Sequence, residues 1–335
     1  MSGDRPGEDD LVRLIRELAR RRAPGVVTGI GDDCAVLEAP GGAALLATTD
    51  LLVEDVHFRR RWAEPADIGA KAIAVNVSDI AAMGGTPRWA LVGLGCPKGT
   101  GSDEIEAFYE GALAVADAYD VVIVGGDTSA SPSGWLVSVT LLGEAVRPIL
   151  RSTAHPGDVI AVTGTLGRAA AGLAVLERDT APPGIEPALL AEVTAAHLRP
   201  RPRVSEGRWL AEAGDVTAMM DLSDGLATDL ARLIGESGAG ARVNVERLPV
   251  ADATRMVAEA LEVDAAAWAT GGGEDYELLV VCKPTALARL REGLAETTST
   301  VLTAVGEIVA GSGIRWLDGR GQPVVVAAGF EHFRG

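Results

Sequence analysis

The stretch "AALLATTD", residues 43–50, is apolar for most of its length and ends in a carboxylate. A short apolar run of this kind predicts a buried strand, here one that ends at Asp50. Other strands are expected at residues 88–96, 121–129, 134–145, 158–164, 216–221, 241–246, 276–282 and 301–309. The strand in "VVIVGGDTS", residues 121–129, is expected to run into a turn at its two glycines. Helices are expected at residues 9–22, 66–83, 102–119, 167–178, 186–198, 203–213, 224–236, 251–262 and 284–296. This alternation predicts an α/β or α+β fold.

The length of the chain and one proline-bearing segment indicate two domains. A chain of 335 residues is longer than one hydrophobic core usually supports. The segment "RPILRSTAHPGD", residues 147–158, interrupts the alternation with two prolines. We therefore expect an N-terminal domain over residues 1–148 and a C-terminal α/β domain over residues 149–335.

The composition excludes several classes of function. A formal net charge of -17 repels the phosphate backbone, so nucleic-acid binding is not expected. No signal peptide is recognisable at the N-terminus, and no apolar run reaches the ~18 residues of a membrane span. Three widely separated cysteines give neither a disulfide framework nor a zinc motif. We expect a cytoplasmic protein with no membrane partner.

One group of acidic residues lies in apolar or glycine-rich sequence, and several of its members end predicted strands, the edge where α/β folds bind ligands. The group comprises Asp32, Asp33, Asp50, Asp79, Asp127, Asp221, Asp224, Glu274 and Asp275. If they converge, two carboxylates ~4 Å apart repel by roughly 4 kcal/mol at an effective dielectric of ~20. Oxygen ligands without a His or Cys cluster select hard cations: Mg²⁺, Mn²⁺ or Ca²⁺. Thr48, Thr49 and Ser223 add hydroxyl oxygens beside these aspartates.

Each of these acids also has a structural interpretation. Asp50 and Asp127 fit the role of turn residues after a strand, and Asp221 or Ser223 fits the N-cap of the following helix. Asp79 lies in the middle of an apolar helix, where an unpaired carboxylate costs several kcal/mol. Its structural alternative is an ion pair with Lys71 or Arg88.

Two glycine runs indicate a phosphorylated ligand. "GGD" at residues 125–127 and "GGGED" at residues 271–275 allow backbone N–H groups to approach an anion closely. Cations beside such loops favour a nucleotide. The patterns GxxxxGK[ST] and GxGxxG are both missing from the chain, so the two commonest nucleotide folds are not expected.

Six motifs taken together resemble the bacterial thiamine-monophosphate kinase family, in order and approximate spacing, across residues 9–333. They are "GIGDDCAV", "TTDLLVEDVHF", "KAIAVNVSDIAAMGG", "VGGDTS", "DLSDGL" and "GGGEDYELL". The family is similar to the aminoimidazole ribonucleotide synthetase superfamily. The resemblance implies two α/β domains, with N-terminal domains that pair across a homodimer to form a β-barrel and bind metal and ATP. It also implies the transfer of a phosphoryl group from ATP to thiamine monophosphate, which gives thiamine diphosphate.

The resemblance assigns roles to individual positions. The implied metal ligands are Asp33, Thr48, Thr49, Asp50, Asp79, Asp127, Asp221 and Asp224. The implied ATP contacts are Tyr109, Gly126, Asp127, Arg151 and Ser223. The implied contacts to thiamine monophosphate are His57, Glu274 and Phe330. In this scheme Asp32 serves the turn, and Phe330 stands where relatives can carry an aromatic residue with a polar tip. Each of these four contacts has an alternative. His57 fits an ordinary surface or core histidine, and Tyr109 and Phe330 fit packing roles. Arg151 fits an ion pair with a surface acid.

The implied chemistry agrees with the residue types. A phosphomonoester is largely dianionic at neutral pH because its second pKa is near 6, so no general base is expected. Transfer then depends on positioning and charge stabilisation, for which several Mg²⁺ ions held by aspartates are suited. We expect direct in-line transfer. Two alternatives stay open: another ATP-dependent synthetase of the superfamily, activating an amide or selenide, or a non-catalytic metal- or nucleotide-binding regulator.

Overall fold

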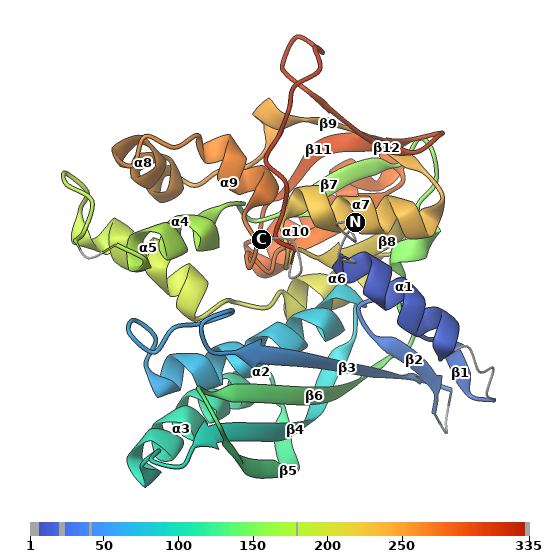
Figure 1. Ribbon diagram of the computed structural model, residues 1–335. Coiled ribbons are helices and arrows are strands. Elements are labelled where there is room, and N and C mark those ends of the chain that lie inside the picture. The colour runs from blue at the N-terminus through green and yellow to red at the C-terminus, as the bar shows by residue number, and fades with distance from the viewer. Residues whose placement is uncertain (1–6, 20–23, 40–41, 179, 332–335) are drawn as a thin grey trace, which may run out of the picture.

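The computed structural model describes residues 7–19, 24–39, 42–178 and 180–331. The chain forms two lobes, each built on a six-stranded sheet, with the C-terminal lobe above the N-terminal lobe in Figure 1. Among the described residues, no helix has the length and apolar character needed to cross a bilayer.

The N-terminal sheet has the strand order β1-β2-β3-β6-β4-β5. Its strands are β1 Val26–Thr28, β2 Ala35–Glu38, β3 Ala44–Val53, β4 Thr86–Pro97, β5 Val122–Ser131 and β6 Leu136–Ala145. Only the pairing of β4 with β5 is parallel among these described strands. Side chains alternate between the two faces of each strand. On β3, Leu46 and Leu52 are therefore buried, whereas Thr49 and Leu51 are exposed on the opposite face.

Two helices cover the inner face of this sheet, α2 Pro65–Ala82 and α3 Ser102–Ala118. Most of α2 is buried, as expected for a helix that is apolar on all sides. Pro65 opens it at the first turn, where a missing N–H is tolerated, and Gly84 follows its end with φ +67°. Helix α2 also contacts α6 and β8 of the C-terminal lobe, so one helix spans both lobes.

The C-terminal sheet has the order β12-β9-β11-β7-β10-β8. Its strands are β7 Val159–Thr163, β8 Val216–Asp221, β9 Gly240–Asn244, β10 Leu278–Cys282, β11 Leu302–Val309 and β12 Gly313–Leu317. The helices of this lobe are α4 Arg168–Leu176, α5 Pro187–Leu198, α6 Val204–Ala213, α7 Leu226–Ser237, α8 Asp252–Ala260, α9 Ala265–Gly271 and α10 Leu287–Thr298. Short 3₁₀ segments lie at η1 Arg151–Thr153, η2 Val245–Arg247 and η3 Pro284–Ala286.

Most predicted elements are present with shifted ends, and four short elements were not predicted: β1, β2, α9 and β12. The predicted helix over residues 9–22 is α1 Glu8–Leu18, and residues 20–22 lie outside the described part. The expected glycine turn after residue 124 is wrong, because β5 continues through Gly125 and Gly126. Gly126 has φ +155°, and a Cβ there would lie 1.8 Å from the Val92 carbonyl oxygen. The glycine therefore lets β5 stay paired with β4 beside an irregularity in their register.

Candidate metal and substrate site

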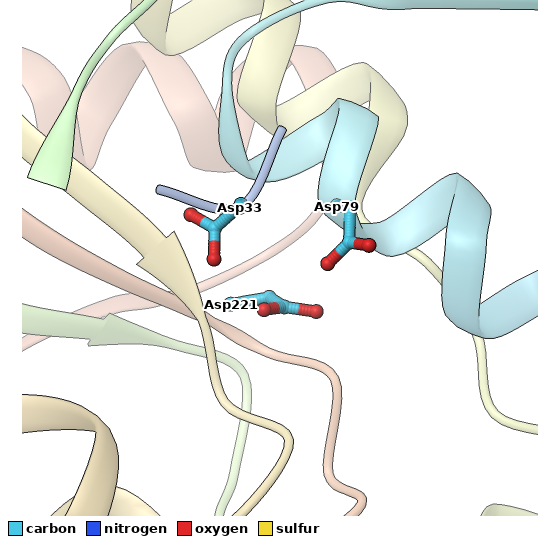
Figure 2. Close-up of side chains that lie close together, drawn as sticks. All are labelled: Asp33, Asp79 and Asp221. Atoms are coloured by element: carbon cyan, nitrogen blue, oxygen red, sulfur yellow. The ribbon is translucent and has the colours of Figure 1, made fainter. Parts of the chain in front are cut away.

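Three carboxylates from distant parts of the sequence meet where the two lobes join. We call Asp33, Asp79 and Asp221 the carboxylate cluster. They come from the loop after β1, from α2 and from the last residue of β8, and Figure 2 shows their side chains pointing toward one another. One oxygen from each lies within 4.8 Å of the others.

Protein donors satisfy only part of this cluster. Thr48 Oγ1 donates a hydrogen bond to Asp79, and Ser78 Oγ donates one to Asp221 at 2.5 Å. Arg151 forms an ion pair with Asp33. The second carboxylate oxygen of Asp33, Oδ2, is buried and has no hydrogen-bond partner among the described residues.

Burial and mutual repulsion disfavour the ionised form of these groups. Burial raises the pKa of Asp33 to about 7. The positive charge of Arg151 lowers this pKa, and the negative charge of Asp221 raises it further. Burial likewise raises the pKa of Asp221 to about 6. The pKa of Asp79 rises well above its ordinary value through burial and the nearby charges of Asp50, Asp221 and Asp33. These carboxylates are thus crowded together without enough protein cations to neutralise them.

Two further predicted ligands lie at the edge of the cluster. Burial and the charges of Asp224 and Asp33 raise the pKa of Asp50 to about 6. The main-chain N–H of Asp50 donates to Asn76 Oδ1 at 3.1 Å, which ties β3 to α2. Asp224 forms an ion pair with Arg232 of α7. The structure therefore brings five of the predicted carboxylates into one neighbourhood.

This donor set fits a hard divalent cation. The cluster offers only oxygen atoms, one of them buried and unpartnered, which is the ligand type of Mg²⁺. The structural alternative for Asp79 is wrong, because Lys71 pairs with Glu274 at 2.7 Å and Arg88 with Glu144 at 3.2 Å. The N-cap alternative for Asp221 and Ser223 is wrong as well, since Gly225 is the N-cap of α7.

The two predicted threonine ligands lie on opposite faces of β3. Thr48 points to the cluster through its bond to Asp79. Thr49 points away, and its hydroxyl donates to the Val139 carbonyl at 3.0 Å. The expectation that the Thr49 hydroxyl lies beside the aspartates is therefore wrong, because side chains alternate along a strand.

Gly126 and Asp127 are not brought to the carboxylate cluster within one chain. Asp50 is in register with Val139, Val139 with Val92, and Val92 with Gly126. Three strand spacings separate Asp50 from Gly126, or about 14 Å. Both residues lie exposed on β5, an edge strand.

Tyr109 is also distant from the cluster. Its ring packs edge-on against Phe108 with centroids 5.2 Å apart, at the margin of the N-terminal core. Helix α3 meets α2 near Gly69, where a Cβ would lie 1.9 Å from the Phe108 carbonyl oxygen. Gly69 precedes Asp79 by ten residues of the same helix, or about 15 Å.

Arg151 and Ser223, by contrast, adjoin the cluster. The main-chain N–H of Arg151 donates to Asp32 Oδ2 at 3.1 Å, and its guanidinium lies against Asp32 and Asp33. The carbonyl of Ser223 accepts a hydrogen bond from the Glu274 N–H at 2.7 Å. Ser223 thus links the end of β8 to the "GGGED" loop.

A second acidic centre lies at the other end of this site. We call Glu274 with its two partners, Lys71 and His197, the Glu274 centre. Lys71 Nζ lies 2.7 Å from Glu274 Oε1 and His197 Nδ1 lies 2.9 Å from Oε2. Burial alone would raise the pKa of Glu274, but the charge of Lys71 and the hydrogen bond from His197 lower it to about 2. This carboxylate is ionised throughout the neutral range.

The other two predicted substrate contacts adjoin the two centres. His57 Nδ1 accepts a hydrogen bond from the Val53 N–H at 3.0 Å, and its carbonyl accepts one from Lys71 Nζ at 3.2 Å. Phe330 donates its main-chain N–H to the Asp224 carbonyl at 2.9 Å, and its side chain is half-exposed.

Asp275 has a structural role that the sequence did not predict. Its carboxylate accepts hydrogen bonds from the N–H groups of Gly167 at 2.6 Å and Ala169 at 3.1 Å. It therefore caps the N-terminus of α4 from a distant loop. Sequence reasoning also missed His197, which follows Lys71 by 126 positions and carries no local motif.

Comparison with known proteins agrees with this architecture. The family described as AIR synthase related protein, N-terminal domain, matches residues 31–145, and its C-terminal counterpart matches residues 155–317. Thiamine-monophosphate kinase of Escherichia coli K12 is 35% identical over 331 residues, which cover 98% of each chain. The chain belongs to the thiamine-monophosphate kinase family.

Solved structures of this family superpose on nearly the whole chain. A structure of AaThiL complexed with AMPPCP and TMP has a TM-score of 0.84 and 33% identity, and covers 99% of this chain and 100% of its own. A structure of thiamine monophosphate kinase from Aquifex aeolicus has a TM-score of 0.78 and 32% identity, with coverage of 94% and 97%. The two-lobed fold is thus that of the family, from one end of the described chain to the other.

Proposed function

We propose that this protein transfers the γ-phosphoryl group of ATP to thiamine monophosphate, which gives thiamine diphosphate and ADP. The observation that carries this proposal is the carboxylate cluster, three acids within 4.8 Å with a buried unpartnered oxygen, in a chain of this family. The similar AaThiL structure was obtained with AMPPCP and TMP, that is, with an ATP analogue and a second phosphorylated ligand.

Several Mg²⁺ ions would occupy the acidic end of the site. The proposed ligands are Asp33, Thr48, Thr49, Asp50, Asp79, Asp127, Asp221 and Asp224. The Thr49 hydroxyl faces the other side of the sheet from the cluster. When bound, such ions neutralise the charge of the phosphate chain and of the incoming phosphate.

The protein residues then have binding and orienting roles. The substrate phosphate is a dianion near pH 7, so the mechanism needs no general base, and we propose direct in-line transfer. Arg151 adds positive charge beside Asp33, where it can screen the triphosphate. At the other end, Glu274 is ionised and attracts the cationic thiazolium ring, with His57 and Phe330 as further proposed contacts.

A second copy of the chain would complete the remaining predicted sites. Tyr109, Gly126 and Asp127 are proposed ATP contacts that lie away from the cluster of their own chain. The open face of the N-terminal sheet exposes apolar side chains, namely Leu51, Trp89, Leu91, Val122, Val124 and Leu136. We propose that this face pairs with a second N-terminal domain, residues 1–148, in a closed β-barrel. Sedimentation velocity would then give twice the mass of one chain.

Phosphorus NMR tests the activity directly. We expect ATP, Mg²⁺ and thiamine monophosphate to be converted to ADP and thiamine diphosphate when the protein is added, with no ATP consumed when the acceptor is omitted. ATP consumption without an acceptor would favour a synthetase of the superfamily, and no consumption at all would favour a regulator. A phosphorylated protein trapped during turnover would reject direct transfer.

A further inference from the structure

Lys71 is a buried cation whose contacts connect several parts of the site. It lies on α2, and its side chain is only 3% exposed. Its ammonium group pairs with Glu274 Oε1 at 2.7 Å and donates to the carbonyl of His57 at 3.2 Å. Removing a lysine from water is costly unless it is paired. The pairing with Glu274 is therefore what allows Lys71 to occupy this position.

The backbone at Glu274 is also unusual. Glu274 has φ +67°, a left-handed conformation that costs a non-glycine residue about 1–3 kcal/mol and clusters at functional sites. Its N–H donates to the Ser223 carbonyl at 2.7 Å. The conformation directs the side chain toward α2 instead of into solvent, and the ion pair holds it there.

His197 provides the second donor from a different helix. Its Nδ1 lies 2.9 Å from Glu274 Oε2, so each carboxylate oxygen has one partner and the plane of the carboxylate is fixed. Trp62 packs edge-on against His197, with ring centroids 5.4 Å apart. Lys71, His197 and Trp62 come from α2, α5 and the segment before α2, so three elements determine the position of one acid.

We propose that Lys71 and His197 are positioning residues that hold Glu274 for the thiamine portion of the substrate. Lys71 lies eight residues before Asp79 on α2, or about 12 Å along the helix axis. A buried helix therefore fixes the distance between the carboxylate cluster and the Glu274 centre. This inference rests on the proposed function, since it concerns how thiamine monophosphate is selected.

The steady-state kinetics of Lys71→Met and His197→Ala test the inference. We expect the KM for thiamine monophosphate to rise about 30-fold or more, since each variant removes one of the two donors that hold the partly buried Glu274 carboxylate. The KM for ATP should stay within about threefold, because the acidic end of the site is intact. Lys283→Met is the matched control, since it removes a lysine from an exposed 2.8 Å pair with Asp215, and we expect wild-type constants.

Rescue by a conservative variant separates positioning from general stability. His197→Asn retains an N–H donor near the position of Nδ1. We expect its KM for thiamine monophosphate to lie much closer to the wild-type value than that of His197→Ala. This comparison holds even if Lys71→Met fails to fold. The inference would be overturned if His197→Ala and the wild type had the same KM for thiamine monophosphate. It would also be overturned if the KM for ATP changed as much as the KM for thiamine monophosphate. A wild-type protein that forms no thiamine diphosphate would overturn the proposed function itself.

Discussion

Helix α2 contributes a residue to both acidic centres, yet the pKa values of their carboxylates shift in opposite directions. In the carboxylate cluster, burial and neighbouring acids raise the pKa of Asp33 to about 7 and that of Asp221 to about 6. In the Glu274 centre, a partly buried acid has its pKa lowered to about 2. The difference is the cation supply: Lys71 lies against the single acid Glu274, whereas the acids of the cluster share Arg151 and Asp79 receives only a hydroxyl donor.

This contrast separates two uses of a buried carboxylate. A group with its own protein cation is ionised and fixed, which suits recognition of an organic ligand. A group of acids with too few protein cations is destabilising until an external cation arrives. Helix α2 thus contributes Asp79 to a centre suited to metal ions and Lys71 to a centre suited to orienting an organic ligand.

The largest expected effect comes from Asp79→Asn. Loss of a metal-binding carboxylate should lower kcat about 10²- to 10³-fold, the range seen when a group that stabilises developing charge is removed. High Mg²⁺ should recover part of the activity. In Mg²⁺-free buffer the variant should unfold at a higher temperature than the wild type, because one member of a repelling group is gone. Steady-state kinetics and calorimetry measure the two effects.

Asp67→Asn is the control on the same helix. Asp67 pairs at 2.6 Å, outside the cluster, with the exposed side chain of Arg199, and ion pairs at the surface contribute little. We expect unchanged kcat. Wild-type activity in Asp79→Asn would mean that Asp79 has only a structural role.

A second expected effect concerns acid stability. The pKa of Glu274 falls from 4.5 when unfolded to about 2 when folded, so its ionised form stabilises the protein above pH 4.5. This stabilisation, about 3 kcal/mol, is lost as the pH falls from about 4.5 to 2. Denaturant titrations should show the wild type more stable than Glu274→Gln near pH 6, with the gap closing below pH 4. A gap independent of pH would contradict the assigned ion pair.

A smaller effect should appear in the response to Mg²⁺. The raised pKa values of Asp33, Asp50 and Asp221, about 7, 6 and 6, mean that metal-free stability falls as the pH rises from about 4 to 7. Mg²⁺ binds the ionised cluster, so it should stabilise the protein more at pH 8 than at pH 5. A Mg²⁺ concentration a hundred times its Kd would raise the free energy of unfolding by about 2.7 kcal/mol. Equal shifts in melting temperature at both pH values would argue against binding at the cluster.

Much of this site could be predicted from the sequence because some signals are local. Asp79 is conspicuous in an apolar helix, and the strand that ends at Asp50 is apparent from a short run. The sequence could also have shown that the Thr48 and Thr49 hydroxyls do not both face the aspartates, since neighbouring side chains on a strand point to opposite faces of the sheet.

Other features depend on contacts between distant segments. Lys71 was considered only as a partner of Asp79, yet it pairs with Glu274, 203 positions further along the chain. Asp275 was grouped with the acids of apolar or glycine-rich sequence but caps α4. The glycines of β5 predicted a turn, whereas Gly126 permits close approach to Val92 within a strand. No periodicity or propensity encodes such pairings.

Crystals grown with Mn²⁺ and a non-hydrolysable ATP analogue test the contrast between the two centres most directly. We expect anomalous difference peaks between the carboxylates of Asp33, Asp79 and Asp221, and none within coordination distance of Glu274, which should keep its contact with Lys71. Peaks beside Glu274, or a cluster that stays without Mn²⁺ while the nucleotide is bound, would contradict the account.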